Sequence, residues 1–191
     1  MSAGAGADPA AEPDVVDLLL AQHARIEELF RAVRSADGAP RRESWQELVE
    51  LLAVHETAEE EIVHPLARTS IDSGQAVVDA RLAEEREAKE LLRELVEAGT
   101  DAPDFAPRLD RLRKVVLEHA TREERYEFPQ LRAAHSAQRL AVLAGAVRAA
   151  EAVAPTRPHP GIESATANLL LGPPTAVVDR VRTAIQAALR D

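Results

Sequence analysis

The sequence contains no cysteine, so disulfide bonds, thiolate metal sites and cysteine nucleophiles are excluded. Aromatic residues make up only 3% of the 191 residues, too few for a platform on which the bases of single-stranded nucleic acid could stack. Positive charge is also scarce. The 23 Lys and Arg stand against 33 Asp and Glu, a net charge of −10, whereas phosphate binding needs a basic face. We therefore expect no nucleic-acid partner.

Long apolar runs are missing as well. No stretch approaches the roughly 20 apolar residues that a membrane-spanning helix needs. The first residues carry neither the basic segment nor the apolar stretch of a secretory signal peptide. We therefore expect a cytoplasmic protein with no membrane partner. What the chain does have is 46% apolar residues, enough to fill a core, and an abundance of Ala, Leu, Glu and Arg that favours helix.

Apolar residues recur at spacings of three and four along most of the chain, which is the period of an amphipathic helix. The pattern predicts four long helices, with Asp14 as the N-cap of the first, and a loop at residues 36–41. The predicted helices cover residues 15–35, 43–68, 75–97 and 105–134. No segment alternates with a period of two. The expected fold is therefore all-α, an up-down-up-down four-helix bundle over residues 14–134.

The two ends of the chain differ from this bundle. Residues 1–13 are rich in Ala, Gly and Pro and are expected to be disordered. Residues 135–191 are expected to form a helical extension, with helices at 136–153 and 173–190. Because so few residues cannot build a second independent core, we expect the extension to pack on the bundle.

Polar residues interrupt the apolar stripes of all four predicted helices. An unpaired buried carboxylate costs on the order of several kcal/mol, so such groups must pair with each other, hold water or bind metal. The residues at positions where the pattern calls for leucine are His23, His55, Glu59, Glu85, His119 and Glu123.

Two of these residues form a pair with the spacing i, i+4, and two more form a second such pair. His55 and Glu59 share one helix face, as do His119 and Glu123, which allows each pair to reach a common ion or neighbouring ions. Imidazole combined with carboxylate suits iron, manganese or zinc. The sequence therefore predicts a metal site in the bundle core. The alternative is a buried polar network without metal.

Two segments of the chain also resemble each other. Residues 55–68 and residues 119–132 are identical at six of 14 positions, at an offset of 64. A weaker similarity, at an offset of 62, places Glu85 where His23 stands. The chain therefore reads as two copies of one helical hairpin. This alignment is the reason to choose Glu85, rather than its acidic neighbours, as the inward carboxylate of the third helix.

Three other polar or aromatic residues lie near the predicted site. On a regular helix His64 is about 140° around the axis from Glu59, so we expect it at the surface. We expect Arg81, one turn before Glu85, to be partly exposed with its stem packed. Tyr126 falls on the stripe of His119, so we expect it to face inward beside the site or in the packing.

With these residues the chain resembles the hemerythrin/HHE cation-binding family. That family has a His on the first helix, His-x-x-x-Glu on the second and His-x-x-x-Glu/Asp on the fourth. Here the match is to His23, His55–Glu59 and His119–Glu123. The resemblance implies a bundle around two iron ions (Fe2+/Fe3+) joined by an oxo or hydroxo bridge. It also implies that the two glutamates bridge the ions, with His23 and His55 on one ion and His119 on the other.

The third helix departs from the family pattern. Oxygen-carrying hemerythrins have two His there, whereas this chain has Arg81 and Glu85. A carboxylate ligand favours ferric iron, which argues against a reversible carrier. We expect a di-iron protein that reacts with or binds dioxygen or peroxide, with catalase- or peroxidase-like activity if it is an enzyme. The alternatives are a sensing or storage module for iron, oxygen or nitric oxide without turnover, and an interaction protein whose site is empty or holds zinc. The ferritin-like class is the nearest rival fold, but it uses Glu-x-x-His.

Overall fold

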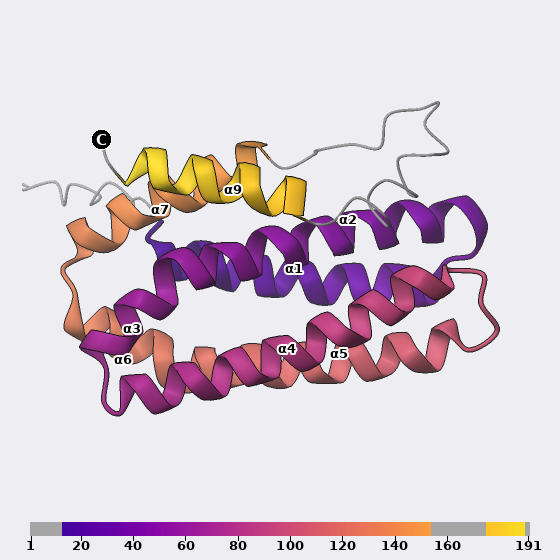
Figure 1. Cartoon of the computed structure of the whole chain (residues 1–191), viewed down its shortest axis with the longest axis horizontal. Coiled ribbons are helices and arrows are strands. Elements are labelled where there is room, and N and C mark those ends of the chain that lie inside the picture. The colour runs from indigo at the N-terminus through magenta and orange to yellow at the C-terminus, as the bar shows by residue number, and fades with distance from the viewer. Residues whose placement is uncertain (1–12, 154–174, 190–191) are drawn as a thin grey trace, which may run out of the picture.

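The computed structural model describes residues 13–153 and 175–189, and every regular element in those two ranges is helical (Figure 1). The elements follow in the order α1 (Val15–Ser35), α2 (Gly38–Ala58), η1 (Glu59–Val63), α3 (His64–Ser70), α4 (Gly74–Ala98), α5 (Phe105–Arg122), η2 (Glu123–Glu127), α6 (Phe128–Ala134), α7 (Ala137–Val153) and α9 (Thr175–Ala188).

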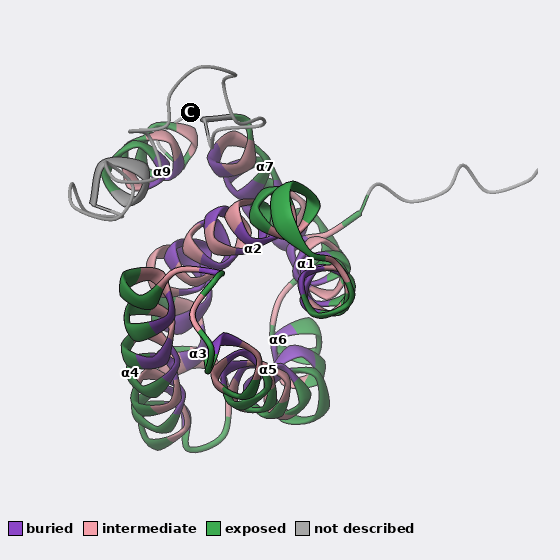
Figure 2. Cartoon of the chain, turned by 90° about the vertical axis from the view of Figure 1, so that its right-hand side faces the viewer, coloured by how far each residue is buried: buried purple, intermediate pink, exposed green. Residues whose placement is uncertain are grey.

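Four antiparallel rods make up the bundle. One is α1 and another is α4. The remaining two are compound, because α2, η1 and α3 run on continuously, as do α5, η2 and α6. Figure 2 shows these rods in a ring, with their buried faces turned toward its centre. The predicted all-α four-helix bundle is confirmed.

The helix starts follow from local chemistry. Asp14 caps α1 as predicted, because its side chain accepts from the Asp17 backbone and Asp17 accepts in return, both at 2.9 Å. The predicted loop at residues 36–41 is wrong from Gly38 onward, where α2 begins. Pro40 falls in the first turn, where a helix has no use for the missing N–H, and Arg41 donates to the Ala36 carbonyl oxygen at 2.7 Å.

The core is divided along the bundle axis. One apolar cluster lies toward the loop that joins α4 to α5, and Trp45 meets Phe105 there edge to face at 5.3 Å. The other lies toward α3 and α6 and includes Leu19, Phe128 and Leu131. Between the two clusters, each rod places polar side chains inward. This polar layer is where the sequence predicts the metal site.

The helices after the bundle pack on one of its sides. α7 lies on α1, and α9 lies on α2 and α7 (Figures 1 and 2). Val181 and Ile185 of α9 are fully buried and join the apolar cluster near α3. The prediction that residues 1–13 are disordered concerns residues that, apart from residue 13, lie outside the described ranges. Within the described ranges, no helix combines the length and apolarity needed to cross a membrane.

Candidate metal centre

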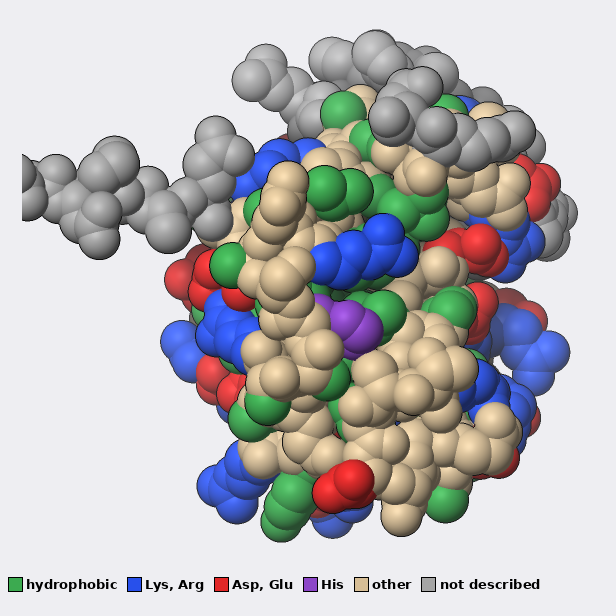
Figure 3. Space-filling view, turned by 90° about the vertical axis from the view of Figure 1, so that its left-hand side faces the viewer, with side chains coloured by type: hydrophobic (Ala, Val, Ile, Leu, Met, Phe, Trp, Pro, Cys, Tyr) green, Lys and Arg blue, Asp and Glu red, His purple; other side chains and the backbone are tan. Residues whose placement is uncertain are grey.

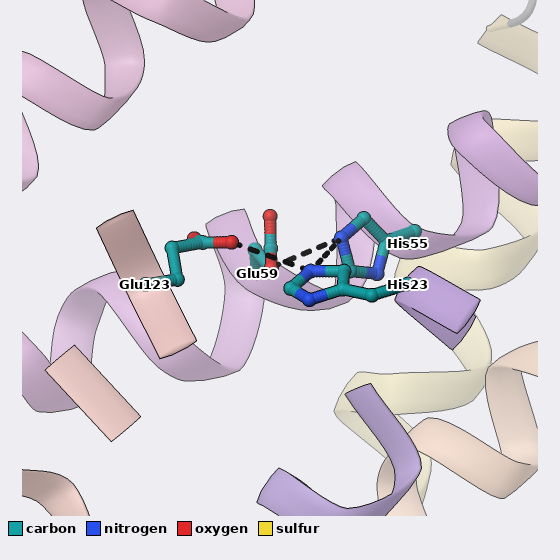
Figure 4. A group of neighbouring side chains, drawn as sticks. All are labelled: His23, His55, Glu59 and Glu123. Carbon is teal, nitrogen blue, oxygen red and sulfur yellow. Dashed lines mark hydrogen bonds and ion pairs between the residues drawn. The ribbon is translucent and has the colours of Figure 1, made fainter. Parts of the chain in front are cut away.

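All six predicted site residues lie in the polar layer. Each is at most 8% exposed, and Glu59 and Glu123 are fully buried. Figure 4 shows four of them, from α1, α2, η1 and η2, pointing toward one another. The two residues not drawn there, Glu85 from α4 and His119 from α5, reach the same layer.

The side-chain atoms form two groups that share Glu59. The first group is His23, His55, Glu59 and Glu123, and the second is Glu59, Glu85 and His119. Within each group one ligand atom per residue lies within 4.8 Å of the others. A distance of 4.8 Å is short enough for all the atoms of a group to surround one ion.

The two central carboxylates each reach both groups. Glu59 Oε1 lies 3.2 Å from His55 Nε2, and Glu59 Oε2 lies 3.6 Å from His119 Nε2. Glu123 Oε2 lies 3.4 Å from His23 Nε2, and Glu123 Oε1 lies 3.3 Å from His119 Nε2. Each carboxylate can therefore contribute one oxygen to each of two neighbouring ions.

The donor set fits a cation. Both oxygens of Glu59 and Glu123 and the Nε2 atom of His119 are buried and have no hydrogen bond, only the mutual contacts of 3.2–3.6 Å given above. Oε2 of Glu85 has only an ion pair with Lys89 at 3.5 Å. Buried polar atoms in folded proteins almost always have partners, so a cluster of unpartnered acceptors calls for one. A metal ion would satisfy these oxygens and nitrogens together.

The outward nitrogens of the three imidazoles all face acceptors. Glu124 lies 2.8 Å from His23 Nδ1, Gln22 Oε1 lies 2.8 Å from His55 Nδ1, and Glu84 lies 3.1 Å from His119 Nδ1. With an acceptor there, each Nδ1 is placed to donate, and the 3.1 Å contact between His23 Nε2 and His55 Nε2 requires a further proton on one of those two atoms. Each Nε2 then points into the site, as in the carboxylate–histidine–metal arrangement of known sites.

Protons and charges compete inside the site. Burial and the charge of Glu123 raise the pKa of Glu59 to about 8. Burial opposes ionisation of Glu123 too, but His119 holds the pKa of that carboxyl well below its usual range. Burial and His23 lower the pKa of His55 well below its usual value. Because bound metal replaces such protons, metal binding here releases protons.

The prediction for His64 is wrong. Its side chain is 2% exposed, and its Nε2 lies 2.5 Å from Glu85 Oε1. The reason is η1, a π-helical turn in which the His64 N–H donates to the Glu59 carbonyl oxygen, five residues back. This wide turn holds one residue more than an α-turn. His64 therefore lies on the same inward face of the rod as Glu59, and not at the surface.

The same π turn recurs in the second copy, at η2, where the Phe128 N–H donates to the Glu123 carbonyl oxygen. The inward prediction for Tyr126 is therefore wrong as well, and this side chain is 64% exposed. Glu127 takes the inward place, 1% exposed and with both oxygens unpartnered. Burial and the charge of Glu123 raise the pKa of Glu127 to about 7.

Helix α4 places its residues largely as the internal alignment suggests. Glu85 is 2% exposed and faces the site, while Glu84 lies at the bundle's side against His119. Arg81 is more buried than predicted, at 9% exposed, because it donates to Glu84 at 2.6 Å. On α4, where oxygen-carrying hemerythrins have two histidines, this chain therefore places the carboxylate of Glu85 in the polar layer.

A signal for the missed residues was present in the sequence. Pro65 and Pro129 fall inside predicted helices, where proline removes a backbone hydrogen bond and distorts the helix. In the structure each proline lies in the first turn after a π turn. The Nδ1 partners Gln22, Glu84 and Glu124 had no such signal, because each of them lies next to an inward residue on an otherwise ordinary helix.

A small cavity of about 20 Å³ adjoins the imidazoles. It has room for little more than one water-sized molecule. Its wall combines the three imidazoles and the carboxylates of Glu56 and Glu85 with apolar side chains, among them Ile26 and Val116. The space next to the imidazoles therefore suits a small molecule.

Comparison with known proteins agrees with this geometry. The profile of the Hemerythrin HHE cation binding domain matches residues 14–149. The crystal structure of a Hemerythrin HHE cation binding domain-containing protein from Mycobacterium kansasii superposes with a TM-score of 0.67 at 20% identity, covering 88% of this chain and 99% of that one. A DNA nickase from Nostoc sp. is 26% identical over 122 residues, which are 62% of this chain and 34% of the nickase.

These matches differ in what they establish. The structural likeness at 20% identity shows the fold. The nickase match leaves about two thirds of that protein uncovered. The family profile covers most of the chain, including every residue of the polar layer named above. The chain therefore belongs to the Hemerythrin HHE cation-binding family and carries its metal-binding domain.

Proposed function

We propose that the chain is a non-haem di-iron protein that reacts with or binds dioxygen or peroxide. The observation that carries the proposal is the pair of ligand groups that share Glu59. In this proposal His23 and His55 hold one ion, and Glu85 and His119 hold the other. Glu59 and Glu123 would contribute to both positions.

Iron suits this set of ligands. Imidazole and carboxylate together also take manganese and zinc, so the choice of iron rests in addition on the family to which the chain belongs. When bound, a pair of iron ions supplies a place for an O–O unit and the electrons to change its oxidation state. The chain's own part is to hold the two positions at a fixed separation in a site closed to bulk water.

The side chains that surround the site limit what can react there. The adjoining cavity suits a molecule of about two heavy atoms, and its apolar wall includes Ile26, Leu52 and Val116. Dioxygen, hydrogen peroxide and nitric oxide are of that size. The imidazoles of His23, His55 and His119 line the same cavity, so such a molecule would lie next to the ions.

Glu85 favours turnover over reversible carriage. An anionic oxygen ligand stabilises the higher oxidation state of iron, and a carrier must return from that state readily. Sensing or storage without turnover is the alternative for the same site, and the peroxide experiment below separates the two.

The match to the Nostoc DNA nickase does not carry DNA cleavage over to this chain. The match spans 34% of the nickase, and the net charge of −10 opposes phosphate binding. On the end of the molecule drawn in Figure 3, Lys and Arg alternate with Asp and Glu and form no basic field.

The decisive experiment is elemental analysis of the purified protein, together with its absorption spectrum before and after exposure to air and the oxygen released on adding peroxide. We expect two iron ions per chain, near-ultraviolet absorption that grows in air, and oxygen release. Zinc or no metal would refute the proposal. Iron with the expected spectrum but without oxygen release would favour sensing or storage.

A variant tests the role given to Glu85. Glu85→His restores an imidazole to the third helix, so we expect slower peroxide consumption and a spectrum that reverses on removal of oxygen. If the spectrum, the iron content and the peroxide rate all stay unchanged, Glu85 does not bind the metal.

A further inference from the structure

Each of the three imidazoles has its Nδ1 next to an acceptor, but only that of His55 lies next to an amide. Gln22 Oε1 lies 2.8 Å from His55 Nδ1, and Gln22 is 4% exposed. An amide has an acceptor at one end and a donor at the other, and either end fits the same space. If the NH2 end faced His55, Nδ1 would have to accept. The imidazole proton would then sit on Nε2, the atom that faces the metal site.

His23 Nε2 lies 3.1 Å from His55 Nε2 and can donate to it, and the other end of Gln22 favours the same arrangement, with the proton on Nδ1, from the opposite side of the ring. Gln22 Nε2 donates to Glu151 Oε1 at 2.7 Å. An ionised carboxylate can only accept a hydrogen bond, so it draws the NH2 end of the amide toward itself. The Gln22 oxygen is then left for His55. Glu151 belongs to α7, outside the four rods and beyond residue 149, where the family match ends.

We propose that Glu151 is a positioning residue of the metal centre, which orients the Gln22 amide and so keeps the proton of His55 on Nδ1 and its Nε2 lone pair toward the site. This inference rests on the ligand role proposed above for His55. It makes the helices after the bundle part of the metal centre, because one of them supplies the charge that fixes a ligand.

The surroundings of His119 show why Gln22, the partner of His55, needs a further residue to orient it. Glu84 stands 62 residues after Gln22, the offset that also relates Glu85 to His23. Glu84 accepts from His119 Nδ1 at 3.1 Å. Because a carboxylate has no donor end, no further group has to orient it. Arg81 and Arg122 hold it directly, at 2.6 and 2.8 Å.

Substitutions at Glu151 test the proposal because they change whether the side chain at this position accepts or donates a hydrogen bond. Glu151→Gln keeps an acceptor, Glu151→Ala removes it, and Glu151→Lys puts a donor in its place. A lysine near the C-terminus of a helix such as α7 also suits the helix dipole, so this variant should not weaken the fold. The exposed residue Glu90 on α4 provides a control, Glu90→Lys, with the same change of net charge.

Two readouts apply to the metal-free protein. Nitrogen-15 NMR of the imidazoles reports which nitrogen of His55 carries the proton, and titration with Co²⁺ reports the affinity of the site. We expect Glu151→Ala to bind Co²⁺ about tenfold more weakly, the lower end of the loss seen when the partner of a metal ligand is removed. Glu151→Lys should bind more weakly still and move the His55 proton toward Nε2. Glu151→Gln should stay near the wild type.

A double variant separates positioning from simple packing. Gln22→Glu with Glu151→Lys rebuilds the carboxylate-and-cation arrangement of the second half, so it should recover Co²⁺ affinity that Glu151→Lys alone loses. If Glu151→Lys matches the Glu90→Lys control in both affinity and tautomer, the proposal is wrong. It is also wrong if all losses follow thermal stability and the double variant restores nothing.

A different result is expected if the proposed function itself is wrong. If the wild type bound no Co²⁺ and no iron, the ligand role of His55 would fall. The tautomer measurement would still show whether Glu151 controls the imidazole, because that measurement needs no metal.

Discussion

The two halves of the metal centre have the same backbone but different side chains. η1 and η2 begin 64 residues apart, at Glu59 and Glu123, and each widens its rod by one π turn. The residue that follows the turn is His64 in the first half and Phe128 in the second. A repeated backbone therefore produces one polar and one apolar neighbour for the same layer.

This difference extends to the ligands. One group contains the imidazoles of His23 and His55, whereas the other contains one imidazole, His119, and the carboxylate of Glu85. Nitrogen-rich and oxygen-rich positions stabilise different oxidation states of a metal. The comparison teaches that internal symmetry of the fold fixes where two ions can lie, while departures from that symmetry set how the two positions differ.

The largest effect should come from the carboxylate that the two groups share. Glu59→Gln removes the charge that serves both positions and leaves the volume unchanged. We expect less than one metal ion per chain by elemental analysis, against two for the wild type. Glu60→Gln, at the next residue, is the control and should bind as the wild type does. Loss of only one ion would show that the positions are independent.

Making the first half resemble the second should have a smaller effect. His64→Phe removes the contact of 2.5 Å to Glu85 and installs the residue found at position 128. Without this partner Glu85 is less well oriented, so we expect Co²⁺ affinity to fall about tenfold at the oxygen-rich position. Calorimetric titration resolves the two positions, and His135→Phe, the same exchange outside the polar layer, serves as the control. Equal affinities in both variants and the wild type would remove His64 from the site.

The reverse exchange concerns stability and its dependence on pH. Glu127→Val installs the residue found at the matching position of the first half, Val63. The folded pKa of Glu127 is raised from 4.5 to about 7, so ionisation opposes folding as the pH rises through that range. The metal-free variant should therefore exceed the wild type in stability above about pH 7, and the gain should shrink toward pH 4.5.

Urea unfolding of the metal-free protein across this pH range measures the effect. The control is Glu90→Val on the exposed face of α4, whose stability difference from the wild type should not vary with pH. A constant difference for Glu127→Val would contradict the expected titration.

The smallest effect concerns α9, which packs against the first half. Arg182 pairs with Glu61 of η1 at 2.5 Å, and the two side chains are 41% and 22% exposed. Because exposed ion pairs contribute little, Arg182→Ala should cost about 0.2–1 kcal/mol of unfolding free energy. Thermal unfolding in low and high salt measures it, and the difference should fall as salt rises. A cost that salt leaves unchanged would point to packing by the arginine stem.

Much of the fold could be predicted from the sequence, because helical periodicity and the cost of burying polar groups act over many residues at once. Asp14 at the N-cap, the four rods and the inward choice of Glu85 all follow from such patterns. The prediction of a metal site rests on the same logic, since His55 and His119 each have a glutamate one turn later.

The parts that could not be predicted depend on single hydrogen bonds. The assignment of His64 to the surface assumed a regular helix, and one i, i+5 bond at Glu59 reverses it. Gln22 and Glu151 are 129 residues apart, so no local pattern relates them. Their contact depends on how α7 docks against α1, which is a property of the folded chain.

The π turns have a consequence for how the sequence can change. Removing one residue from positions 60–62 would turn the i, i+5 bond into an ordinary i, i+4 bond and leave His64 and the residues after it facing as they do now. Keeping all the residues but winding them as a regular α-helix would instead rotate everything after the turn by about 100° about the axis. His64 would then leave the interior and the surface of α3 that meets α4 would turn away, although every amino acid remained the same.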